Sequence, residues 1–191
     1  MLLARYYYVT GALRAAAYHA NAAVRLAIDA GFHQLGSMRA SAISQARAQA
    51  QVQLQAQTQM PWSNGSELSE NSLELDASSD AVEMGERLGV WWQAYALDRV
   101  LSVGLKKPPC VSDDETTAMC IDAPWPGDIE EYENVSADAI RGDSTLRMFI
   151  ANSGQQPAGV PGGFSHLALR VKAVALYELA TKVSANLGLR K

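Results

Sequence analysis

Glu86-Arg-Leu-Gly-Val-Trp-Trp-Gln-Ala-Tyr-Ala-Leu-Asp-Arg-Val-Leu-Ser-Val-Gly-Leu-Lys-Lys-Pro108 is the stretch that decides the fold. On a helix of about 100° per residue, its apolar side chains cover two broad faces. One face carries Met84, Leu88, Trp91, Trp92 and Tyr95, and the other carries Val90, Ala94, Leu97 and Leu101. A helix that is apolar nearly all round lies in the middle of a helical protein. The stretch therefore predicts an all-α, multi-helical domain built around this segment.

Two adjacent charged residues, Asp98 and Arg99, interrupt this apolar pattern. Because an unpaired buried charge is strongly destabilising, both side chains need partners. Two interpretations follow. In the favoured one, neighbouring helices and backbone groups hold both charges, which fix how the helix packs. In the other, a charged group lines an internal pocket.

The order of residue types in this region points to a family. It resembles the middle homology region of fungal-specific zinc-cluster transcription factors, which is their regulatory domain and is distinct from the domain that binds DNA. Family members typically show an arginine, an aromatic pair, a tyrosine, leucine-aspartate-arginine, leucine-serine, a glycine-arginine-proline turn and an acidic segment. The resemblance marks ten residues as motif positions that are structural or line a pocket: Arg87, Trp91, Trp92, Tyr95, Asp98, Arg99, Ser102, Pro108, Asp113 and Asp114.

A second match lies upstream. Residues 22–33, ending in Gly31-Phe32-His33, resemble the family's helix that ends in glycine-leucine-histidine. The two motifs together span roughly residues 2–126. The chain departs from the family pattern at the turn, where Lys106-Lys107 stands in place of glycine-arginine, and this removes an easy position for positive φ.

The net charge and the cysteine content limit the functions that this chain can have. A net charge of −4 argues against DNA binding by this chain, since phosphate binding needs a basic face. The only cysteines, Cys110 and Cys120, are ten residues apart and are expected to be free thiols, so no metal or other cofactor is predicted here. By the resemblance, zinc belongs to a six-cysteine cluster outside this chain. Without a membrane-spanning stretch or a signal peptide, the chain is expected to be soluble and intracellular, and the resemblance implies the nucleus.

The composition divides the chain into three parts. Residues 1–35 and 80–191 are expected to form the helical regulatory domain, with helices at residues 2–9 and 13–30. Residues 36–79 are rich in Gln, Ala and Ser, and form either a solvated helix near residues 40–57 or plain disorder. We expect this part to be an inert insertion or linker, with an activation-type contact surface as the alternative. The helical start without a cap suggests a domain that is incomplete at its N-terminus.

Later elements are expected as follows. The central helix begins at Asp80, with Glu83 at capping-box spacing, and ends near Leu105. An irregular segment follows to residue 126, and its Trp125 packs on the helices. Short helices occupy parts of residues 136–152. Ser165 caps a helix at residues 167–187 whose buried stripe is predicted to consist of Leu169, Leu176, Val183 and Leu187, with Val171 and Leu179 nearby.

The sequence offers little for catalysis. The phosphate-binding glycine loop, the nucleophile elbow and the His-Glu-x-x-His pair are absent, and His19, His33 and His166 are far apart. We therefore expect no enzyme. The resemblance implies a regulatory domain that controls transcription, with DNA contacted only through another domain, co-regulators and a small-molecule inducer as candidate partners, and no membrane contact. A helical interaction module without a sensing role is the alternative, and an α-helical enzyme is a remote one.

Overall fold

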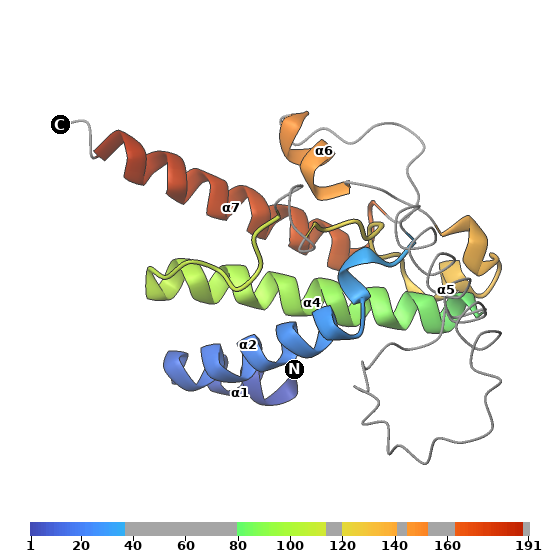
Figure 1. Cartoon of the computed structure of the whole chain (residues 1–191), viewed down its shortest axis with the longest axis horizontal. Coiled ribbons are helices and arrows are strands. Elements are labelled where there is room, and N and C mark those ends of the chain that lie inside the picture. Colours follow the sequence, from blue (N-terminus) through green and yellow to red (C-terminus); the bar gives the residue numbers. More distant parts are fainter. Residues whose placement is uncertain (37–79, 114–119, 141–144, 153–162, 189–191) are drawn as a thin grey trace, which may run out of the picture.

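Helix α4 (Ala81–Leu105) runs through the middle of the structure, a computed structural model that describes residues 1–36, 80–113, 120–140, 145–152 and 163–188 (Figure 1). Before it come α1 (Leu2–Val9), α2 (Leu13–Asp29) and the short 3₁₀ turn η1 (Phe32–Gln34). After it come α5 (Ile129–Tyr132), the 3₁₀ turn η2 (Ala137–Ala139), α6 (Thr145–Ala151) and α7 (His166–Gly188). The described residues contain helices and no strand, which confirms the all-α prediction.

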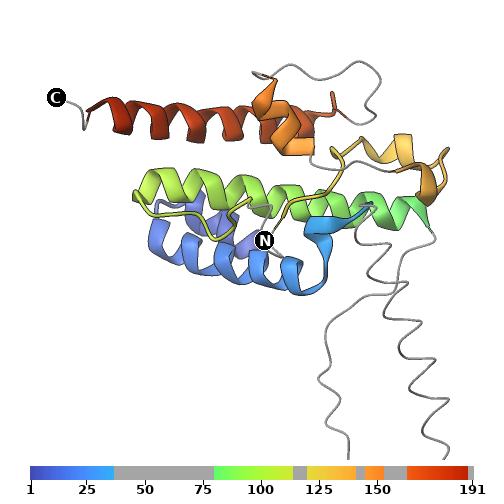
Figure 2. The same cartoon turned by 45° about the horizontal axis from the view of Figure 1, so that its top comes forward.

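The long helices form layers around α4. Helix α2 packs on one side of α4 and α7 packs on the other, while α1 pairs with α2 (Figure 2). The larger core surrounds the first part of α4, where Leu88, Trp91 and Trp92 are fully buried. A second core joins α1 and α2 to Leu97 and Leu101. The prediction that this segment lies in the middle of a helical protein is confirmed.

Both ends of α4 follow from its sequence. Asp80 caps the start, because its Oδ1 accepts a hydrogen bond from the N–H of Val82 at 3.0 Å. At the end, the N–H of Lys107 donates to the carbonyl of Ser102 and the N–H of Lys106 donates to that of Val103, which is the Schellman pattern. Lys106 has φ 54°, so a lysine adopts the left-handed conformation that glycine usually supplies.

Helix α2 packs through small residues. Ala16, Ala20 and Ala27 are buried at helical spacing, which lets the backbones of neighbouring helices approach closely. Gly31 follows the helix with φ 76°, in the left-handed region that a terminating glycine supplies. The predicted break at Thr10-Gly11 also separates α1 from α2, with Gly11 at φ 79°.

Residues 120–126 are buried although they form no helix. Such a segment must satisfy its backbone polar groups inside the protein. The N–H of Asp122 donates to the carbonyl of His33 at 2.8 Å, and the carbonyl of Pro124 accepts from the indole of Trp92 at 2.7 Å. Trp125 is buried and stacks on Trp92 with ring centroids 5.1 Å apart, as the sequence predicted for this indole.

The predicted buried stripe of α7 is wrong except at Val171, which is buried as predicted. Its large apolar residues are exposed: Leu169, Leu176, Leu179, Val183 and Leu187. Ala168 and Ala175 face the core beside Val171, because the bulky aromatic residues of α4 fill the space between the two helices and leave room only for small partners. The predicted cap is confirmed, since the Oγ of Ser165 accepts from the N–H of Ala168 at 3.1 Å.

Other predictions are not tested by the described residues. The Gln-rich segment at residues 37–79 lies outside them, so its interpretation as an insertion or linker stays a prediction.

The predicted short helices after residue 136 are confirmed as η2 and α6, whereas α5 was missed. No helix in the described ranges combines the length and the apolar character that crossing a membrane requires.

Candidate functional site around Asp98 and Arg99

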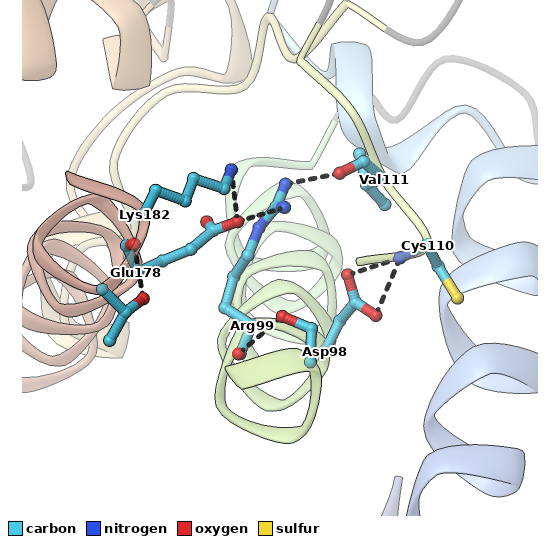
Figure 3. Close-up of polar contacts among 8 residues, drawn as sticks. Asp98, Arg99, Cys110, Val111, Glu178 and Lys182 are labelled. Carbon is cyan, nitrogen blue, oxygen red and sulfur yellow. Dashed lines mark hydrogen bonds and ion pairs between the residues drawn. The ribbon is translucent and has the colours of Figure 1, made fainter. Parts of the chain in front are cut away.

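Asp98 and Arg99 are adjacent in sequence but point in different directions (Figure 3). Asp98 faces the chain that returns along α4, where both of its carboxylate oxygens lie 3.1 Å from the backbone N–H of Cys110. The side chain is buried. Burial raises the pKa of Asp98, while the Cys110 N–H and the neighbouring Arg99 oppose this rise. Asp98 therefore anchors the segment after α4.

Arg99 joins three parts of the chain. Its Nη1 lies 3.3 Å from Oε1 of Glu178 in α7, and its Nη2 donates to the carbonyl of Val111 at 2.6 Å (Figure 3). Only 4% of Arg99 is exposed. Glu178 also pairs with Lys182 at 2.7 Å, so one carboxylate serves two cations. The predicted need for partners is met for both charges of the pair.

Tyr95 lies beside Arg99 on the same face of α4. The guanidinium carbon of Arg99 sits 4.7 Å from the centre of the phenol ring, within the range of a cation–π contact. Burial raises the pKa of Tyr95 to about 12, and the positive charge of Arg99 limits this rise. Tyr95 therefore stays neutral, and its negative ring face helps to compensate the buried cation.

The aromatic pair Trp91-Trp92 forms the core beneath this site. Trp92 contacts Tyr95 edge to face at 5.5 Å, and Trp91 lies 5.9 Å from His33. Both indoles are fully buried. The indole N–H of Trp91 meets no hydrogen-bond acceptor among the described residues, whereas that of Trp92 is satisfied by Pro124.

The remaining motif positions are spread along α4 and beyond it. Arg87 pairs with Glu83 one turn away at 2.6 Å, near the start of the helix. The hydroxyl of Ser102 donates to the carbonyl of Arg99 at 2.9 Å, and Pro108 is exposed. Asp113 accepts from the N–H of Ile121 at 2.9 Å. Asp114 lies outside the described residues.

The sequence pattern does not reveal a second polar cluster, because its members come from distant segments. Arg147 of α6 donates to Asp122 at 3.0 Å and contacts the sulfur of Cys120 at 3.0 Å, with Asp113 at 3.8 Å. Burial raises the pKa of the Cys120 thiol, and the hydrogen bond to Asp122 adds to this effect. The thiol therefore stays protonated at neutral pH, and the cluster ties α6 to the irregular segment.

Lys172 of α7 was also missed. Its Nζ donates to the carbonyl of Gly163 and lies near three aromatic rings, those of Trp125 at 4.9 Å, Phe149 at 5.5 Å and Phe164 at 5.4 Å. Burial lowers the pKa of this ammonium group. A search for apolar residues at helical spacing could not find Lys172, because the stem of a lysine packs like an apolar side chain while its charge contacts the faces of aromatic rings.

The contacts around Asp98 and Arg99 hold the helices and the following segment together. Each charge of the candidate site is matched by a backbone group or by an opposite charge, and the nearest rings are packed against one another. Within the described ranges, no three histidine, cysteine or acidic side chains gather as metal ligands do. The described geometry therefore joins α4 to α7 and to residues 110–113.

Comparison with known proteins supplies the family. The family model described as "Fungal specific transcription factor domain" matches residues 1–158, which cover both motifs of the sequence and all of α4. This family consists of regulatory domains of transcription factors and is not an enzyme family. No match was found among the curated proteins or among the solved structures. The chain belongs to the fungal-specific transcription factor domain family.

Proposed function

We propose that this chain is the regulatory part of a transcription factor and controls a DNA-binding zinc cluster that lies outside it. The family match over residues 1–158 is the observation that carries the proposal. The net charge of −4 supports a DNA-binding head elsewhere, since a domain that neutralises phosphates needs a basic surface. The proposed place of action is the nucleus, as the family suggests.

The proposed mechanism is a shift between two packings of the helices around α4. Arg99 contacts α7 and residue Val111 at once, so a change in its partners alters the position of two segments together. A small-molecule inducer or a co-regulator that binds one packing more tightly raises the population of that packing. The linked head then becomes more active or less active.

A reporter assay tests this function. The chain is fused to an unrelated DNA-binding domain and compared with that domain alone and with a fusion to an unrelated helical protein of similar size. We expect the chain to change reporter output by roughly 5-fold or more, the size of a typical coupling between sites. The purified chain is also titrated with duplex DNA at low salt. Unchanged output, or strong DNA binding by the chain itself, would contradict the proposal.

A further inference from the structure

Helix α7 exposes an apolar stripe on the side that faces away from the core. The residues on this stripe alternate at spacings of four and three: Leu169, Ala173, Leu176, Ala180, Val183 and Leu187. All six are exposed, with Leu169 at 52%, Val183 at 50% and Leu187 at 62%. Tyr177 and Leu179 flank the centre of the stripe and are exposed as well. Monomeric proteins rarely leave a continuous apolar surface of this kind uncovered.

The spacing is that of a coiled-coil seam. Apolar residues that repeat every 3.5 positions form the a and d positions of a heptad, and these positions insert into a partner helix. A different face of α7, about 120° round the helix, is already used, because Ala168, Val171 and Ala175 pack against the core. The exposed stripe is therefore a second interface on the same helix.

We propose that the stripe pairs with the same stripe of a second copy of this chain, in antiparallel orientation. In an antiparallel pair, a positions face d positions, so small residues can meet large ones. Centring the pair on residue 178 sets Leu176 against Ala180 of the other copy and Ala173 against Val183. A parallel pair would instead stack alanine on alanine and leave voids.

The seam itself is free of charge. The six stripe positions carry no charge. Glu178, at the centre of the pair, points to Arg99 in the core of its own copy. Charge therefore does not oppose the pairing, and its orientation rests on the fit of small residues against large ones.

The length of the stripe sets the expected affinity. From Leu169 to Leu187 the helix extends about 27 Å, so the contact falls at the small end of specific interfaces. We expect a dimer with a dissociation constant in the micromolar range that is insensitive to salt, because the stripe is apolar. At lower concentrations the 20.6 kDa chain should be a monomer.

Sedimentation equilibrium over a range of concentrations measures this dimer, with a reducing agent present because Cys110 is exposed. The variants Leu176→Lys and Ala180→Glu each place an unpaired charge in the seam and should raise the dissociation constant at least ~30-fold. Mixing the two variants should restore a heterodimer, since Lys at one position then faces Glu at the other. Leu26→Lys, on an exposed leucine of α2, is the matched control. Circular dichroism verifies that every variant folds.

The outcomes separate the alternatives. A mass that rises toward two copies, falls in both single variants and recovers in the mixture supports antiparallel pairing. A wild-type chain that stays monomeric at several hundred micromolar overturns the proposal, and protection of the stripe from solvent labelling in that monomer would assign it to another segment of the chain. A dimer that ignores both variants, or that weakens equally in Leu26→Lys, also overturns it.

Discussion

The guanidinium of Arg99 lies 3.3 Å from the carboxylate of Glu178, which follows 79 positions later in the chain. This ion pair connects the central helix α4 to α7 and is almost fully removed from water. An exposed pair contributes little to stability, whereas removing one partner of a buried pair leaves an uncompensated charge. The packing of α7 therefore depends on Arg99.

Replacing Arg99 with methionine should destabilise the chain by about 3 kcal/mol, because the buried Glu178 keeps only the exposed Lys182 as its partner and the carbonyl of Val111 loses its donor. The double variant Arg99→Met with Glu178→Leu should recover part of this loss, since no buried charge remains unpaired. Urea unfolding followed by circular dichroism measures both values. If the loss from Arg99→Met and the loss from Glu178→Leu alone simply add in the double variant, the ion pair has no energetic role.

Lys106→Gly should stabilise the chain by about 1 kcal/mol. Lys106 holds φ 54° at the end of α4, a conformation that is costly for a residue with a Cβ and free for glycine. Thermal melting measures the shift. Lys107→Gly is the control and should give no gain, because Lys107 has no positive φ. An unchanged or lower melting temperature for Lys106→Gly would contradict the Schellman assignment.

Replacing each of two glycines of α4 with alanine should change the stability of the chain in opposite directions. A Cβ at Gly85 would overlap the ring of Tyr132, so Gly85→Ala should destabilise the chain by about 1–3 kcal/mol, the usual cost of overpacking. A Cβ at Gly89 meets no neighbour within 4 Å. Gly89→Ala should therefore add about 0.5–1 kcal/mol through helix propensity. Equal effects in chemical unfolding would show that Tyr132 does not pack against Gly85.

Alkaline pH should destabilise the chain in part through Tyr95. Burial raises the pKa of Tyr95 from 10.0 to about 12, so this contribution to stability is complete below pH 10 and is lost as pH rises through 12. Relative to Tyr95→Phe, the wild type should lose up to about 2–3 kcal/mol across this window. Unfolding curves of the two proteins between pH 9 and 12 provide the test. A constant difference would mean that Tyr95 reaches water.

The sequence predicts most of the fold around α4, because burial on nearly all sides leaves a strong pattern in Trp91, Trp92 and Leu88. It also indicates that Asp98 and Arg99 need partners. The identity of those partners could not be predicted. Glu178 and the backbone of Cys110 come from distant or irregular segments, and only the packed structure brings them to α4.

The error in α7 has a physical cause. The leucines form the more regular stripe, and hydrophobicity alone favours burying them. The bulk of Trp92 and Trp125 beside α7 selects alanine and valine for the inner face, together with Lys172, whose ammonium group lies over the ring of Trp125. The sequence pattern of one helix gives no information about the size of the side chains that pack against it.

Under the proposed function, the packing of α4 on α7 controls transcription. The most direct measurement compares reporter output from the fused chain with that of the double variant Arg99→Met with Glu178→Leu, and with a control that removes the more exposed ion pair, Glu83→Gln with Arg87→Met. We predict that the first variant changes the output while its circular dichroism spectrum stays native, and that the control leaves the output as it was. Unchanged output in a folded Arg99→Met, Glu178→Leu chain would contradict the account.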